Sequence, residues 1–228
     1  YSKNLFKLKI SNNAKIIYSN LKGQVAQKIL GFKNAKTKFI MQLDSDIILS
    51  KKTIEHLYNF ILINKKKVAV APLLLPNINH NLKKKYNLST SLKNYILSGS
   101  PNLLPGKITD IGYNTWFSSY ELSDASIQVE WLPGGCILFH KNAIIKKNYY
   151  PFKNKAYCED IIHSLLLTQK NVKLFLLPMT KARNLGYPKS RTNLFQRLRE
   201  INVRLFILKK IRGNKIRFLI WYFLYVFK

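Results

Sequence analysis

Two pairs of carboxylates are the residues of this chain whose types and spacing are most suited to chemistry. The 228 residues include 39 Lys and Arg but only 10 Asp and Glu, and four of those acids form the pairs Asp44/Asp46 and Glu159/Asp160. Each pair lies beside an apolar run, where an unpaired charge is costly to bury. Paired carboxylates bind hard divalent cations or exchange protons with a substrate. Both pairs are therefore candidate site residues.

The first pair lies within residues 39–50, FIMQLDSDIILS, whose large apolar side chains predict a buried strand. Asp44 and Asp46 are two residues apart, so in an extended backbone they project to the same side, about 6.6 Å apart. If the backbone turns where the strand ends, both carboxylates can converge on one divalent ion or on a ligand's hydroxyl groups. The alternative is a strand that ends in a polar turn, with Asp46 capping the next element.

The second pair precedes apolar residues with helical spacing, in residues 154–167, NKAYCEDIIHSLLL. Glu159 and Asp160 are therefore expected in the first turn of a helix, where the helix dipole alone favours carboxylates by about 0.3–1 kcal/mol each. The functional alternative is a helix N-terminus that presents a general base to a cleft. His163, one turn farther along, is expected to be structural.

Two adjacent glycines lie between the acid pairs, in residues 129–139, VEWLPGGCILF. Gly134 and Gly135 would let a ligand approach the backbone closely. A simple tight turn before a strand at residues 136–139 is the alternative.

The elements that must position these residues alternate between strands and helices. We expect strands at residues 15–20, 39–50, 68–75, 136–139 and 172–177, and helices at 21–32, 51–63, 91–97 and from 159 onward. We expect Gly31 to end the helix at residues 21–32 and Pro178 to end the strand at residues 172–177. Strand–helix–strand order favours parallel strands with right-handed crossovers. The predicted fold is α/β, a mostly parallel sheet flanked by helices, with a loop-rich excursion over residues 77–126.

The chain changes character after Pro178. All seven arginines lie at or beyond Arg183, and an apolar stripe with a basic opposite face predicts an amphipathic helix; the stripe is Phe195, Leu198, Ile201, Leu205 and Leu208. Residues 218–227 are apolar but too short to cross a bilayer, which takes about 20. We expect a domain at residues 1–180 and a basic amphipathic helical extension at 181–228. The extension is either an interfacial segment on anionic lipid or a packing element.

The formal net charge of +29 would attract nucleic acid, an anionic membrane surface or phosphorylated substrates. The sequence has no helix-turn-helix, zinc-finger or RNP-type pattern, which argues against nucleic acid. Cys136 and Cys158 have neither disulfide-framework nor metal-ligand spacing, so we expect reduced thiols in a cytoplasmic protein. No signal peptide is recognised, and a peripheral position on the inner face of the cell membrane is expected.

Three motifs in order, LDSD at residues 43–46, EWLPGGC at 130–136 and CED at 158–160, resemble the family 2 glycosyltransferases with a GT-A fold. The resemblance extends over about residues 15–178, and the residues upstream that fit it are Asn20, Gly23, Ala26 and Gly31. Two features depart from the family pattern. No convincing first strand and helix precede Lys15, which predicts a fragment. No His follows Pro178 as a further metal ligand, and Asn184 or a water would have to bind the metal instead.

The resemblance implies a nucleotide-sugar donor site. Asp44 would contact the nucleoside part of the donor. Asp46, with Asp44 in the same metal site, would hold Mg²⁺ or Mn²⁺ against the diphosphate. Trp131, Gly134 and Gly135 would border the pocket for the donor sugar and the acceptor.

The resemblance also implies the reaction. Asp160, with Glu159 beside it, would be the general base that deprotonates an acceptor hydroxyl, on a glycan or a lipid-linked acceptor in polysaccharide biosynthesis. Attack opposite the diphosphate leaving group would invert the anomeric centre. Two other classes remain as alternatives: a non-catalytic basic module that binds nucleic acid or membrane, and a nucleotidyltransferase.

Overall fold

The computed structural model describes residues 14–20, 22–64, 67–75, 88–98, 103–117, 124–152, 156–185 and 194–226. The helices are α1 (Gln24–Asn34), α2 (Thr53–Ile63), α3 (Leu88–Ser98), α4 (Glu159–Gln169), α5 (Leu194–Ile211) and α6 (Lys215–Val226). The strands are β1 (Phe39–Leu43), β2 (Ile47–Leu49), β3 (Val68–Leu75), β4 (Ile127–Val129), β5 (Cys136–His140) and β6 (Lys173–Asn184).

The six strands form one mixed sheet in the order β1-β5-β3-β6-β2, with β4 also paired to β6. Of the described pairings, β3–β6 is parallel, and β1–β5, β3–β5, β2–β6 and β4–β6 are antiparallel. The α/β class is confirmed, but the expectation of a mostly parallel sheet is wrong. Each strand that follows a helix directly (β1, β3 and β6) runs in one direction, as crossover connections require. Strands β2, β4 and β5 follow loops or turns and run the other way.

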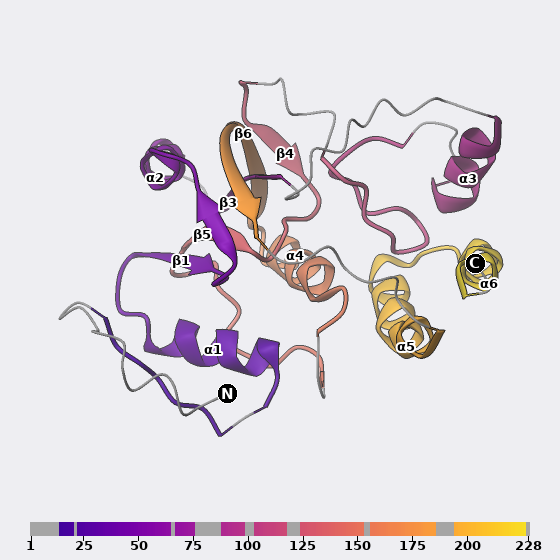
Figure 1. Cartoon of the computed structure of the whole chain (residues 1–228), viewed down its shortest axis with the longest axis horizontal. Helices are drawn as coiled ribbons and strands as arrows, with labels where there is room; N and C mark the ends of the chain where they lie inside the picture. Colours follow the sequence, from indigo (N-terminus) through magenta and orange to yellow (C-terminus); the bar gives the residue numbers. More distant parts are fainter. Residues whose placement is uncertain are drawn as a thin grey trace.

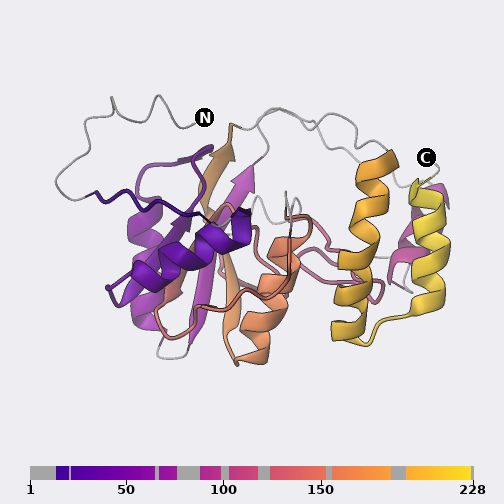
Figure 2. The same cartoon turned by 90° about the horizontal axis from the view of Figure 1, so that it is seen from below.

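Helices cover both faces of this sheet (Figures 1 and 2). Alternate residues of a strand point to opposite faces. Ile137 and Phe139 of β5 pack into a core with Leu167 of α4, whereas Leu138 packs into a second core with Leu57 of α2. Helix α1 joins the first core, so α1 and α4 cover one face and α2 the other.

Strand β6 continues past Pro178, where the sequence predicts its end. Pro72 of β3 pairs with Leu177, but the next residue, Leu73, pairs with Lys181, so residues 178–180 form a bulge. Neither proline has an N–H to give to the ladder, so the irregularity falls where both are placed. The bulge lets β6 run on to pair with β2, which brings Asn184 opposite Ile47, next to the Asp44–Asp46 turn.

Other sequence expectations are confirmed or corrected locally. The expected elements at residues 51–63, 68–75, 91–97 and 136–139 are present, with ends that differ from the prediction by no more than three residues. Residues 15–20 form no strand, and residues 39–50 form two short strands separated by a turn. Helix α1 continues three residues beyond Gly31, whose position is open to solvent. Much of the expected loop at residues 77–126 lies outside the described residues.

Helices α5 and α6 pack side by side at one end of the molecule (Figures 1 and 2). The apolar stripe predicted for α5 is not the side that packs on the core, because Phe195, Leu198 and Leu205 are exposed and only Leu208, at its end, is fully buried. Its buried face instead includes the ion pair of Glu200 and Arg204 (3.1 Å). The Arg204 guanidinium also stacks over aromatic rings, which sequence periodicity does not anticipate.

Within the described residues, no helix is both long and apolar enough to cross a membrane. The division of the chain at residue 180 stays a prediction, and β6 continues through that position to Asn184.

Candidate active site

The first acid pair lies in the turn that leaves β1. The Asp44 backbone N–H donates to the Gly135 carbonyl (2.8 Å), and the Asp46 carbonyl accepts from the Leu185 N–H (2.7 Å). The Asp44 side chain is half-buried and that of Asp46 is exposed. The end of β1 therefore holds both carboxylates between the glycine turn and the end of β6.

The second acid pair lies in the first turn of α4, as predicted. Both Glu159 oxygens are bound: Oε1 accepts from the Tyr149 hydroxyl (2.7 Å), and Oε2 pairs with the Lys28 ammonium (3.2 Å). Asp160 accepts a hydrogen bond from the Ile161 N–H (3.0 Å) at one oxygen and is partly exposed. Of the two acids, Asp160 has the freer carboxylate.

Gly134 lies between the two pairs. A methyl group added there would come 3.2 Å from Glu159 Oε2 and 3.3 Å from Lys28 Nζ. The Gly134 carbonyl accepts from the Gln42 side-chain amide of β1. The adjacent glycines therefore allow the turn after β1 to approach the N-terminus of α4 closely. A tight turn alone would not require this close approach.

Burial raises the pKa of Asp44 above its usual range, and the negative charges of Asp46 and Glu159 act in the same direction, while Lys28 opposes them. The two acid pairs are thus close enough to act on one another electrostatically. The positive charge of Lys28 lowers the pKa of Asp44 in one pair and of Asp160 in the other.

Burial also raises the pKa of Asp160, to about 6, with a contribution from the neighbouring charge of Glu159. The Ile161 N–H and Lys28 act in the opposite direction. A carboxyl group with such a pKa is ionised at neutral pH but binds protons more readily than an ordinary aspartate, which suits a general base.

Four residues that support the site were not singled out from the sequence: Lys28, Gln42, Tyr149 and Ser164. Lys28 could have been noticed from its helical spacing, because it lies on the same side of α1 as the buried residues Val25, Ile29 and Phe32. Ser164 Oγ accepts from the Leu132 N–H (3.0 Å) and thereby fastens α4 to the segment before the glycines.

His163 is structural, as expected. Its ring stacks on Tyr149 (5.8 Å between centroids), and burial lowers its pKa to about 4, so it is neutral at physiological pH.

Trp131 is corrected from a ligand-contacting residue to a core residue. Its side chain has no exposed surface, its indole N–H donates to the Thr115 carbonyl (3.0 Å), and its ring stacks on Phe117 (4.7 Å). The sequence places Trp131 next to the glycines, but the backbone turns its side chain into the core. We therefore leave it out of the proposed site.

Within the described part of the chain, no group of three or more His, Cys, Asp or Glu side chains is placed to hold a metal. Of the described carboxylates, Asp44 and Asp46 are the pair placed to share a cation at the end of β1. This set fits Mg²⁺, which is commonly held by one or two carboxylates while substrate phosphates and waters complete its coordination.

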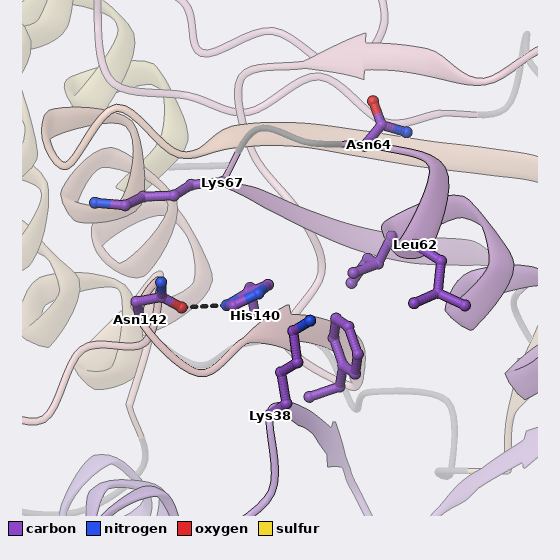
Figure 3. Close-up of a pocket in the computed structure, with 8 residues that line it drawn as sticks. Lys38, Leu62, Asn64, Lys67, His140 and Asn142 are labelled. Carbon is purple, nitrogen blue, oxygen red and sulfur yellow. Dashed lines mark hydrogen bonds between the residues drawn. The ribbon is translucent and has the colours of Figure 1, made fainter.

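A pocket of about 210 Å³ opens at the opposite end of the sheet (Figure 3). Lys38 and Phe39 line it at the start of β1, and His140 lines it at the end of β5. Because the acid pairs lie beyond the other end of β1, this pocket is separate from the candidate active site.

Gly134→Ala is expected to lower both activity and stability, the latter by about 1 kcal/mol, because the added methyl group would push the end groups of Lys28 and Glu159 outward by a small distance. Urea unfolding and a transfer assay would measure the two effects. Gly31→Ala is the control, since nothing lies within 4 Å of its added methyl group. It should stabilise helix α1 by about 1 kcal/mol. Equal behaviour of the two variants would contradict the tight packing described at Gly134.

Comparisons with known proteins identify the family. The family model described as Glycosyl transferase family 2 matches residues 3–123, which include Asp44 and Asp46 but not Glu159 and Asp160. No curated protein matches the chain. A similar solved structure is the crystal structure of GalNAc-T7 with UDP, GalNAc and Mn²⁺. The identity is 12% and the TM-score 0.48, over 78% of this chain and 34% of that one. The family model spans just over half of the residues, and the chain therefore belongs to glycosyl transferase family 2.

Proposed function

We propose that the protein is an inverting glycosyltransferase that moves a sugar from a nucleotide-diphosphate donor to a hydroxyl of a glycan or lipid-linked acceptor. The observation that carries this proposal is the position of the Gly134–Gly135 turn: the Gly135 carbonyl accepts from the Asp44 N–H, and Gly134 is next to the Lys28–Glu159 pair, with no room for a Cβ to spare. One site therefore has acidic groups for a cation and a separate acidic group for proton transfer.

Asp44 and Asp46 form the proposed donor side of the site. Asp44 is the proposed contact for the nucleoside, and the exposed Asp46 for a divalent cation, with Asp44 near enough to share it. A bound Mg²⁺ or Mn²⁺ would neutralise charge on the diphosphate leaving group. Asn184 is a candidate neutral ligand because β6 places it opposite Ile47, directly after Asp46.

Asp160 is the proposed general base. It would accept the proton of the acceptor hydroxyl while that oxygen forms a bond to the anomeric carbon. The bond from the anomeric carbon to the phosphate oxygen breaks, and its electron pair leaves with the nucleoside diphosphate. Attack from the side opposite the leaving group inverts the anomeric configuration. Glu159 is bound at both oxygens, so we assign it to holding Lys28 and Tyr149 rather than to proton transfer.

The base assignment predicts a pH dependence. Because Asp160 must be ionised to accept a proton, transfer should fall as the pH is lowered through about 6. Lys28 favours the ionised form, so Lys28→Gln should move this acidic limb to higher pH, and Lys28→Arg should largely restore it. The measurement is kcat/KM against pH, with Lys33→Gln, an exposed residue of the same helix, as the control. An unmoved limb in folded Lys28→Gln would remove Lys28 from this role.

A panel of nucleotide-sugars tested for transfer and hydrolysis is the direct test of the function. The expected products are a nucleoside diphosphate and a glycoside whose anomeric configuration, read by NMR, is opposite to that of the donor. A product with the donor's configuration would contradict an inverting reaction. Release of pyrophosphate from a nucleoside triphosphate and a sugar phosphate would instead identify a nucleotidyltransferase.

A further inference from the structure

Helices α5 and α6 each have apolar side chains on the surface that faces away from the protein core. On α5 the exposed residues include Phe195, Leu198 and Leu205, and on α6 they include Ile216, Leu219, Ile220 and Leu224, with exposed fractions between 42% and 73%. We call this set the outer apolar face. The opposite side of α6, with Phe218 and Trp221, is buried against α3 and α5. Helix α6 is thus apolar on its inner and outer sides.

Two hydrogen bonds tie the start of α5 to the end of α6. The Tyr222 hydroxyl donates to the Arg197 carbonyl (2.8 Å), and the Arg197 guanidinium donates to the Val226 carbonyl (3.3 Å). The first turns of α5 therefore lie beside the last turn of α6. Both helices thus contribute exposed apolar side chains at this end of the hairpin, with Phe195 and Leu198 on α5 and Leu224 on α6.

The solvent-exposed charges on the hairpin are positive. Lys209, Lys210, Arg212 and Lys215 are exposed where α5 passes into α6. The single acid in residues 194–226, Glu200, is buried in its ion pair with Arg204. Helices that lie in a membrane interface combine exposed apolar side chains with cationic ones, as these two helices do, with the apolar side among the acyl chains and the charges at the head groups.

We infer that the α5–α6 hairpin is a docking surface for an anionic lipid membrane. A second copy of the chain is a poor occupant of the same face, because the contact would bring together two chains of formal charge +29. Nucleic acid would pair its phosphates with the lysines but would not bury the exposed leucines and isoleucines. An anionic bilayer satisfies both, through its phosphate head groups and its acyl chains. The inference does not depend on sugar transfer, since membrane binding can be measured without a donor.

Sedimentation of the purified protein with phosphatidylcholine vesicles, with and without phosphatidylglycerol, tests this inference. Binding should be at least about tenfold stronger to the anionic vesicles and should weaken as salt is raised. Leu219→Glu and Phe195→Glu should each weaken binding about tenfold, since each places a charge on the outer apolar face. Ile63→Glu is the matched control, because Ile63 is 80% exposed on α2, away from the hairpin.

A second variant pair tests the charges without altering the outer apolar face. Lys209→Gln/Lys210→Gln should reduce binding to anionic vesicles about tenfold or more, and Lys33→Gln/Lys36→Gln, exposed on the other side of the molecule, should not. Thermal unfolding confirms that each variant is folded. Absent vesicle binding, or equal binding to both lipid compositions, would overturn the inference. Loss of a dimer in Leu219→Glu, seen by sedimentation velocity, would assign the face to a second copy instead.

Discussion

Asp160→Asn is expected to reduce sugar transfer by a factor of about 10² to 10⁴ while the fold stays intact. Asparagine has nearly the same shape as aspartate and can still accept the hydrogen bond from the Ile161 N–H (3.0 Å). It cannot take a proton from an acceptor hydroxyl at neutral pH. Donor binding should be nearly unaffected, because the substitution removes a proton acceptor and not a donor contact. Steady-state kinetics should therefore show a lower kcat with a similar donor KM.

The control for Asp160→Asn is Asp124→Asn, which changes an exposed aspartate by the same substitution. Glu159→Gln is the informative comparison at the site itself. It leaves Lys28, a largely buried partner, without its carboxylate and should therefore lower stability as well as activity. Full transfer activity in folded Asp160→Asn would remove Asp160 as the base and leave the reaction without an assigned proton acceptor.

Asp46→Asn is expected to abolish the metal dependence of donor binding. The Asp46 side chain is exposed, so its loss should leave stability nearly unchanged. Removing one of only two protein carboxylates at the proposed cation site should weaken nucleoside diphosphate binding in Mn²⁺ by about tenfold or more. Sugar transfer should fall with it. Isothermal titration calorimetry with nucleoside diphosphates, with Mn²⁺ and with a chelator, measures the effect directly.

Asp124→Asn serves again as the control for Asp46→Asn, and the chelator arm shows how much binding needs no metal. If wild-type protein binds a nucleoside diphosphate equally with and without Mn²⁺, the cation site is wrong even if the donor site is right. If it binds none under either condition, the proposed donor site itself is contradicted. The two outcomes separate the role of the metal from that of the carboxylates.

The directions of strand pairing could not be predicted from the order of elements alone. Helix-linked strands do run parallel, as the crossover rule states, and β1, β3 and β6 obey it. The position of β5 between β1 and β3 depends instead on long-range contacts, since Ile137 and Phe139 complete the core under α4. No local pattern in residues 136–140 specifies which neighbours the strand will have.

Trp131 and Lys28 show that, within the site too, long-range contacts decide what the local sequence does not. The position of Trp131 next to the glycines suggests a site residue, whereas the helical spacing of Lys28 indicates only that it faces the core and not which residue it meets. The structure buries Trp131 against Phe117 and brings Lys28 to Glu159, 131 residues away. Side-chain direction and distant ion pairs are set by packing between elements, which spacing along the chain does not encode.

The sequence by itself determined the local elements and the residue types available for chemistry: the strand before Asp44, the helix that begins at Glu159, and the glycines between them. These features follow from hydrophobic periodicity and backbone preference, which act within one element. Only the tertiary structure decided that both acid pairs lie next to the glycine turn and that Lys28 pairs with Glu159. It also decided which side of α5 is buried. Both depend on contacts between segments far apart in the chain, and those contacts form only when the sheet and its helices pack together.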